Sequence, residues 1–180
     1  MPKENELTNN EPAGNAPDLA REDENFEALM VLREGRRNVV YRDSRGLPTV
    51  GIGHLVVPAD HLVVGDTISD DWVNALFRQD SAAAMCAARS QAAEAGTTDS
   101  AFIPYLASVN FQLGTAWTAK FPNTWRMIVD GEYIEAALAL DSTLWCRETP
   151  VRVADFQQAL RDLPPKQPAY RAVSNSLVLI

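Results

Sequence analysis

This 180-residue sequence lacks the features that would indicate a membrane protein or an exported one. No stretch approaches the roughly 18 consecutive apolar residues of a membrane-spanning helix. The first residues, Met1 to Glu6, lack the basic and apolar segments of a signal peptide. We therefore expect synthesis without a signal peptide, so that any export depends on another route.

Cysteine and histidine are scarce, with two of each. His54 and His61 show no zinc-ligand spacing with cysteines or acids, so we expect no metal, and nothing indicates a cofactor. Cys86 lies in an apolar helical stretch and Cys146 follows a tryptophan. Their spacing permits a disulfide without requiring one, and in the absence of a secretory signal we favour free, buried thiols.

Basic residues are fewer than acidic ones, so the formal net charge is -8. An acidic chain of this kind does not favour nucleic-acid binding. Residues 1–25 hold seven acids against two bases and so carry -5 of that charge. Arginines nevertheless gather in one later segment, as Arg33, Arg36, Arg37, Arg42 and Arg45. Such a cluster is either a solvated surface or a means of attracting an anionic substrate, and the sequence does not decide between them.

Hydrophobic patterning divides the chain into a tail, one domain and an extension. Residues 1–20 contain almost no large apolar side chain, which predicts a flexible acidic tail. Residues 21–165 are enough for one domain with a sizeable core. We expect the apolar end of the extension, residues 166–180, to pack on the body, with docking to a partner as the alternative.

Within the domain, helical and β patterns alternate. A first helix is predicted to end at Glu34, and a β-rich stretch follows it. Ser69 is the expected N-cap of a long helix from Trp72 to Ala93, and more helical segments follow, the last of them a single amphipathic element from Trp145 to Leu160 that Pro164 stops. These patterns predict an α+β fold with a small β-containing lobe and a larger helical lobe joined by a long helix.

Two carboxyls bracket the start of the β-rich stretch. Glu34 precedes a helix-stopping glycine, so we expect it at a helix C-terminus, partly buried, with a raised pKa. Asp43 lies in a polar turn, where a carboxylate keeps a low pKa. Cleaving a glycosidic bond requires such a pair, an acid for the leaving oxygen and a carboxylate that stabilises positive charge or activates water. A Glu and an Asp at this spacing, taken alone, more often have no catalytic role, so other residues of the site have to be present as well.

Further matches surround the pair in an ordered series of blocks. The first block runs without a gap through Glu34-Gly35, Tyr41, Asp43, Gly46, Thr49 and Gly51-Ile52-Gly53-His54-Leu55. Later blocks include Gln79-Asp80, Asn110-Phe111-Gln112-Leu113-Gly114, Phe121, Asn123-Thr124 and Trp145 followed by Thr149-Pro150 and Arg152. Over residues 26–163 the chain resembles the T4-type phage lysozymes, glycoside hydrolase family 24.

This resemblance implies a lysozyme-like catalytic domain over residues 21–165 and a role for each matched residue. Glu34 is the expected catalytic acid, and Asp43 and Thr49 are expected to hold the attacking water. The remaining implied residues are the glycan contacts Leu55, Phe111 and Thr124 and the supporting residues His54, Asp80 and Arg152. Of these, His54 should form an ion pair with Asp80 between the lobes, and Arg152 should pair with Glu34.

One implied glycan contact has a second interpretation, and one contact of the family is missing from this sequence. Phe111 has ordinary core packing as an equally good interpretation, because aromatic side chains dominate protein cores. The family's glycan-binding asparagine corresponds to Ala139, which offers no hydrogen bond, so one subsite is weaker or rebuilt.

The activity implied by the resemblance is that of an inverting muramidase, a lysozyme that cleaves the β-1,4 bond between N-acetylmuramic acid and N-acetylglucosamine in peptidoglycan. We expect a monomer that is made in the bacterial cytoplasm without a signal peptide and acts on peptidoglycan in the periplasm after release or injection, and we favour a phage endolysin. The alternatives are a secreted antibacterial effector with an immunity or inhibitor protein as partner, and a catalytically silent module that binds cell walls. Retention of Glu34, Asp43 and Thr49 together argues against the silent module.

Overall fold

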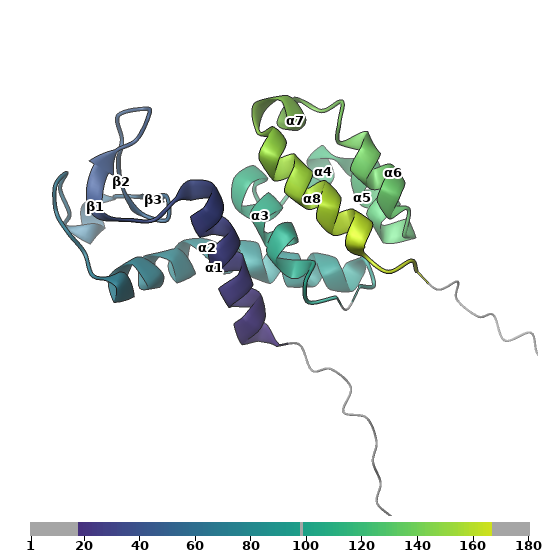
Figure 1. Ribbon diagram of the computed structural model, residues 1–180, viewed down its shortest axis with the longest axis horizontal. Helices are drawn as coiled ribbons and strands as arrows, with labels where there is room; N and C mark the ends of the chain where they lie inside the picture. Colours follow the sequence, from purple (N-terminus) through teal and green to yellow (C-terminus); the bar gives the residue numbers. More distant parts are fainter. Residues whose placement is uncertain (1–17, 98, 167–180) are drawn as a thin grey trace, which may run out of the picture.

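The computed structural model describes residues 18–97 and 99–166 (Figure 1). A small sheet lies toward one end of the long helix α2 (Asp70–Glu94), and a group of helices lies toward the other. The predicted α+β architecture, with its β-containing lobe, helical lobe and connecting helix, is confirmed. The expected tail and extension fall almost entirely on residues 1–17 and 167–180, outside the described part of the chain. None of the described helices is both long and apolar enough to cross a membrane.

Helix α1 (Leu19–Glu34) ends where the β-containing lobe begins. Asp18 is its N-cap and accepts a hydrogen bond from the Arg21 backbone N–H at 3.2 Å. Phe26 and Met30, four residues apart on one face, are buried in the core. The helix stops at Gly35, whose φ of 76° is one that residues with a Cβ rarely adopt. The end of α1 is therefore determined locally, as the sequence predicted.

The sheet is antiparallel and follows the chain order β1 (Arg37–Arg42), β2 (Pro48–Gly51) and β3 (His54–Leu55). Val40 and Val50 are buried and attach one face of the sheet to the core. In β1 and β2, Tyr41 pairs with Thr49. Because side chains alternate along a strand, Tyr41 and Thr49 lie on the face opposite to the two valines.

Helix α2 begins as predicted, with the Ser69 hydroxyl accepting a hydrogen bond from the Trp72 N–H at 3.2 Å. Arg89 near its C-terminal half bonds the carboxylates of Glu22 and Asp23, at 2.9 Å and 2.6 Å respectively. The first turn of α1 is thereby tied to α2. Glu22 is buried, and its pairing was not foreseen from the sequence.

The helical lobe consists of shorter helices packed around an aromatic core. They are α3 (Ile103–Leu113), α4 (Trp117–Lys120), α5 (Pro122–Asp130), α6 (Tyr133–Ala139), α7 (Leu144–Glu148) and α8 (Pro150–Asp162). In the core, the rings of Trp117 and Phe102 each lie 5.8 Å from that of Phe156. One helical element had been expected from Trp145 onward, but there are two, because Pro150 begins a new helix.

The two cysteines do not form a disulfide with each other. Their expected free state is therefore what the structure shows, but their expected burial is wrong for Cys86, which is exposed, whereas Cys146 is half-buried. Cys86 occupies the outer side of α2, because the core-facing positions of that helix belong to Met85 and Ala88.

Candidate active site

Glu34 is the last residue of α1 and lies against the turn that follows β2. A Cβ built on Gly53 would lie 3.9 Å from the Glu34 Cγ, so the backbone of that turn comes close to the Glu34 side chain. The expected partial burial of Glu34 among apolar groups is wrong, because its side chain is 38% exposed. The reason is that α1 ends at an open surface between the lobes, with Arg152 rather than an apolar wall beside the carboxylate.

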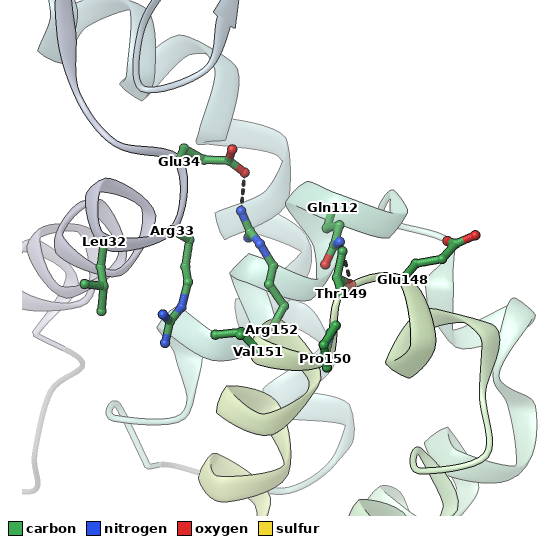
Figure 2. Close-up of a pocket in the computed structure, with 9 residues that line it drawn as sticks. All are labelled: Leu32, Arg33, Glu34, Gln112, Glu148, Thr149, Pro150, Val151 and Arg152. Carbon is green, nitrogen blue, oxygen red and sulfur yellow. Dashed lines mark hydrogen bonds and ion pairs between the residues drawn. The ribbon is translucent and has the colours of Figure 1, made fainter. Parts of the chain in front are cut away.

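Arg152 forms the predicted ion pair with Glu34. Its guanidinium also donates to the Ser108 hydroxyl at 2.9 Å and lies beside the Met30 sulfur. Because the Arg152 side chain is only 10% exposed, these neighbours hold it in one orientation. Figure 2 shows it reaching from the start of α8 toward Glu34. The helical lobe thereby fixes the position of a carboxylate that belongs to α1.

Asp43 lies in the turn between β1 and β2, where backbone groups bond its carboxylate. Its Oδ1 accepts hydrogen bonds from the backbone N–H of Leu47 at 2.8 Å and of Arg45 at 2.9 Å. Its Oδ2 lies 3.2 Å from the Arg45 guanidinium. The Leu47 hydrogen bond, followed by those from Arg45, lowers the pKa of Asp43 below its ordinary value. The predicted low pKa is confirmed.

Thr49 is buried in β2, two residues after Leu47. Its hydroxyl donates a hydrogen bond to the Leu47 carbonyl at 3.2 Å, while the Leu47 N–H bonds Asp43. A single residue of the hairpin thus binds both expected water-holding side chains through its backbone. The Thr49 oxygen keeps its lone pairs for other donors, and the Oδ2 atom of Asp43, which accepts from Arg45, has further acceptor capacity.

His54 begins β3 and is buried between two carboxylates. Its Nδ1 lies 2.8 Å from Asp80 Oδ2 on α2, which confirms the predicted pair. Its Nε2 lies 3.1 Å from Asp60 Oδ2, in the short 3-10 helix η1 (Pro58–Asp60). Burial alone would lower the pKa of His54, but the two aspartates outweigh it and raise this pKa above its ordinary value.

The three expected glycan contacts lie in different environments. Leu55 is exposed and pairs with Thr49 across the sheet. Phe111 is half-buried, with its ring 6.3 Å from that of Phe26, so core packing accounts for at least part of its surface. Thr124 is buried in α5 and does not line the pocket at Glu34. Glycan contact by these residues therefore stays a prediction.

A pocket of about 550 Å³ adjoins Glu34 on its helical-lobe side (Figure 2). Its lining residues are Leu32, Arg33, Glu34, Gln112, Glu148, Thr149, Pro150, Val151 and Arg152. Gln112 donates to the Thr149 hydroxyl at 3.0 Å and accepts from the Trp145 indole at 2.9 Å. Both ends of the Gln112 amide are thus fixed, a role that was not recognised in the sequence because its partners come from α7 and the α7–α8 junction.

Three of the five clustered arginines bond acids of this chain. Arg33 makes two hydrogen bonds of 2.6 Å to Asp155. Arg36 bonds the carboxylates of Glu27 and Asp70, and Arg45 bonds that of Asp43. Most of the cluster therefore has a structural explanation.

Within residues 18–97 and 99–166, no three His, Cys, Asp or Glu side chains are grouped so that they could hold a metal ion.

The sheet, the long helix and the carboxyl at the end of α1 define a lysozyme-like protein. The profile of the phage lysozyme family matches residues 32–155, and the chain belongs to that family. It is 27% identical over 144 residues to peptidoglycan hydrolase gp36 of Pseudomonas phage phiKMV; the match covers 79% of this chain but 16% of that protein. It is 26% identical to a probable T4-type lysozyme 2 of Dictyostelium discoideum, over 69% of this chain and 86% of the relative.

Proposed function

We propose that this protein is a muramidase that hydrolyses the β-1,4 bond between N-acetylmuramic acid and N-acetylglucosamine in peptidoglycan. Membership of the phage lysozyme family and the peptidoglycan hydrolase and lysozyme names of its relatives support hydrolysis of peptidoglycan. One observation carries the proposal. Glu34 lies at an open helix end, and the adjoining sheet holds Asp43 and Thr49 through the backbone of Leu47.

In the proposed reaction, Glu34 gives a proton to the leaving oxygen as the glycosidic bond breaks. A water oxygen attacks the anomeric carbon from the opposite face and passes its proton to Asp43. The lowered pKa of Asp43 supports this division of roles, because the base has to be ionised before attack. Thr49 orients the water through its hydroxyl, which the Leu47 carbonyl keeps in place.

Arg152 is the proposed positioning residue for Glu34. It bonds the carboxylate directly, and it is itself held by Ser108 and Met30. Because Arg152 is itself held in place, its ion pair restricts the orientation of the Glu34 carboxyl, whereas an isolated glutamate at a helix end would sample several rotamers. This contact supports the assignment of Glu34 rather than a neighbouring acid as the proton donor.

For the biological role, we propose an endolysin that reaches periplasmic peptidoglycan during release of a phage. The phage relative supports this choice over a secreted effector paired with an immunity protein. Because the chain corresponds to only a small part of that relative, the role is best tested in its genetic setting. A neighbouring holin gene would support the endolysin, and a neighbouring immunity gene would contradict it.

The chemical proposal is tested by the ends of the glycan fragments. Purified peptidoglycan is digested, the products are reduced with borohydride, and the reduced sugars are identified by mass spectrometry. A muramidase leaves N-acetylmuramic acid at the new reducing end, so reduced muramic acid is the expected product. Reduced glucosamine would show that the other glycosidic bond is cleaved, and no products at all would support a silent binding module.

A further inference from the structure

Arg37, at the start of β1, has its guanidinium stacked on an aromatic ring of the same strand. Its central carbon lies 4.4 Å from the centroid of the Tyr41 ring, a cation–π contact. Among residues 18–97 and 99–166, Arg37 forms no ion pair, whereas Arg33, Arg36 and Arg45 each bond a carboxylate. Arg37 is thus an exposed cation that is held in position without being neutralised.

This cation lies along the strand that connects the two parts of the candidate site. Arg37 follows the end of α1 after two residues and pairs with Gly51 in β2, close to the turn that contacts Glu34. Tyr41 pairs with Thr49, on the sheet face opposite to the buried valines. Arg37 and Tyr41 are thus the cross-strand partners of Gly51 and Thr49, and a glycan held between Glu34 and Thr49 in the proposed reaction would lie near them.

The stacking leaves particular atoms of Arg37 available. The guanidinium carbon lies over the Tyr41 ring, and within residues 18–97 and 99–166 the N–H groups of Arg37 donate no hydrogen bond, whereas those of Arg36 and Arg42 do. A fork of parallel N–H donors matches the two oxygens of a carboxylate. Peptidoglycan offers carboxylates that a neutral glycan does not, on its stem peptides and, where the stem is missing, on the lactyl group of muramic acid.

We propose that Arg37, positioned by Tyr41, binds a carboxylate of peptidoglycan and so favours this substrate over an uncharged glycan. The inference rests on the proposed function, since it names the feature of the substrate that the site recognises. The chain carries a formal net charge of -8, so a polyanionic substrate needs a local cation to offset repulsion. Within the described residues, Arg37 and Arg42 are the two members of the arginine cluster without a carboxylate partner, and Arg42 donates to the Gly46 carbonyl, whereas Arg37 lies over the Tyr41 ring.

The test compares Arg37→Ala with the parent on three soluble glycan preparations. They are intact uncrosslinked strands, strands stripped of stem peptides by an amidase, and intact strands whose carboxyls have been converted to amides. On intact strands, we expect KM to rise about tenfold, which corresponds to ~1.4 kcal/mol, with kcat little changed. On the amidated strands the variant and the parent should be equal. If Arg37→Ala also raises KM on stripped strands, the lactyl carboxylate is a ligand of Arg37. If the two proteins have equal KM on stripped strands, the ligand is a carboxylate of the stem peptide.

Two substitutions at Tyr41, a second one at Arg37 and one control separate binding from structure. Tyr41→Phe keeps the ring and should behave as the parent, while Tyr41→Leu removes the π face and should raise KM in the same direction as Arg37→Ala. Arg161→Ala removes the same charge from the exposed end of α8 and should leave KM unchanged. Arg37→Lys keeps the charge without the fork and should recover only part of the affinity.

The inference fails if Arg37→Ala and the parent have equal KM on intact strands. It also fails if Arg37→Ala raises KM on amidated strands, because the effect would then be structural. Binding of the intact and amidated strands to Glu34→Gln, with and without Arg37→Ala, supplies the same comparison without hydrolysis. A parent protein that binds strands through Arg37 but never cleaves them would contradict the proposed function alone. The two proposals can therefore fail separately.

Discussion

The Asp60 Oδ2 atom lies 3.1 Å from the Nε2 atom of His54, on the side of the imidazole opposite to Asp80. Both ring nitrogens thus have a carboxylate partner, and only the doubly protonated ring can donate to both. Asp80 belongs to α2 and Asp60 to η1, so one imidazolium connects the long helix with the segment that follows the sheet. We therefore expect the attachment of the β-containing lobe to depend on pH.

The stability of this attachment should be greatest between about pH 3.8 and 6.5, the ordinary values for Asp60 and His54. Because the pKa of His54 is raised, its contribution is fully present below 6.5 and is lost as pH rises through the folded value. Burial opposes ionisation of Asp60, but the Val57 N–H and His54 outweigh it and lower the Asp60 pKa. Its contribution is therefore lost as pH falls through the folded value.

Replacing Asp60 by Asn should lower the His54 pKa, as followed by NMR titration of the ring protons. The free energy of unfolding, measured in urea from about pH 5 to about pH 9, should then change less with pH than in the parent. Asp162→Asn, which removes a carboxylate from the far end of α8, is the control and should alter neither quantity. An unchanged His54 pKa in Asp60→Asn would show that the contact with Asp60 does not raise this pKa.

Replacing Glu34 by Gln should reduce lysis of outer-membrane-permeabilised cells by about 10²–10⁴-fold, because an amide cannot donate the required proton. Circular dichroism and the melting temperature should show that the fold is retained. Glu148→Gln changes a carboxyl that lines the same pocket but points away from Glu34 in Figure 2, and it should remain active. Glu34→Gln activity within about tenfold of the parent, a barrier change of only ~1.4 kcal/mol, would contradict the acid role.

Replacing Arg45 by Ala should leave the Asp43 pKa below its ordinary value of 3.8, because the hydrogen bond from the Leu47 backbone is the largest cause of the shift. Carbon-13 NMR of the Asp43 carboxyl measures this pKa directly, and the acidic limb of kcat/KM should stay below the same value. In the proposed mechanism Asp43 has to be ionised, so we expect activity to fall as pH drops through that pKa. A rise of the Asp43 pKa to its ordinary value in Arg45→Ala would assign the shift to the ion pair instead.

Replacing Arg89 by Ala should destabilise the fold by about 2 kcal/mol, because it leaves the buried Glu22 carboxylate without its cation. The expected loss is below that of a fully buried pair, since the Arg89 side chain is 32% exposed. Urea unfolding near neutral pH measures it. Arg126→Ala on α5, where both partners of the ion pair are largely exposed, should cost less than about 1 kcal/mol. If both substitutions lower the free energy of unfolding by the same amount, the contact with the buried Glu22 does not contribute more to stability than an exposed ion pair.

The elements that the sequence predicted correctly depend on contacts between near neighbours. Gly35 ends α1, Ser69 caps α2, and Asp43 bonds the backbone of its own turn. Each of these effects acts within a few residues, so sequence patterns reveal it. The break before α8 was missed although Pro150 is also local, because apolar spacing continues smoothly across it.

Contacts between distant segments account for most of what sequence reasoning missed or misjudged. Nothing local indicates that Glu22 will meet Arg89 or that Gln112 will be fixed by α7. Asp60 is close to His54 in sequence, but its role depends on how η1 folds back. The burial of Glu34 was misjudged for a related reason, since the apolar spacing of α1 says which face is buried but not how open the helix end is.

The stereochemistry of cleavage tests the role of Thr49. If Asp43 attacked the sugar itself, the product would retain its configuration, whereas a water held by Asp43 and Thr49 attacks from the opposite face and gives an inverted α-product. The hydrogen bonds of both side chains to Leu47 place a carboxylate and a hydroxyl together on one hairpin, which is the arrangement a bound water requires. NMR of the anomeric proton immediately after cleavage, before mutarotation, identifies the first product. Thr49→Glu should then trap the sugar covalently or redirect the reaction to retention, because its carboxylate fills the position of the water. A β-anomer as the first product of the parent would exclude the held water and the role of Thr49 with it.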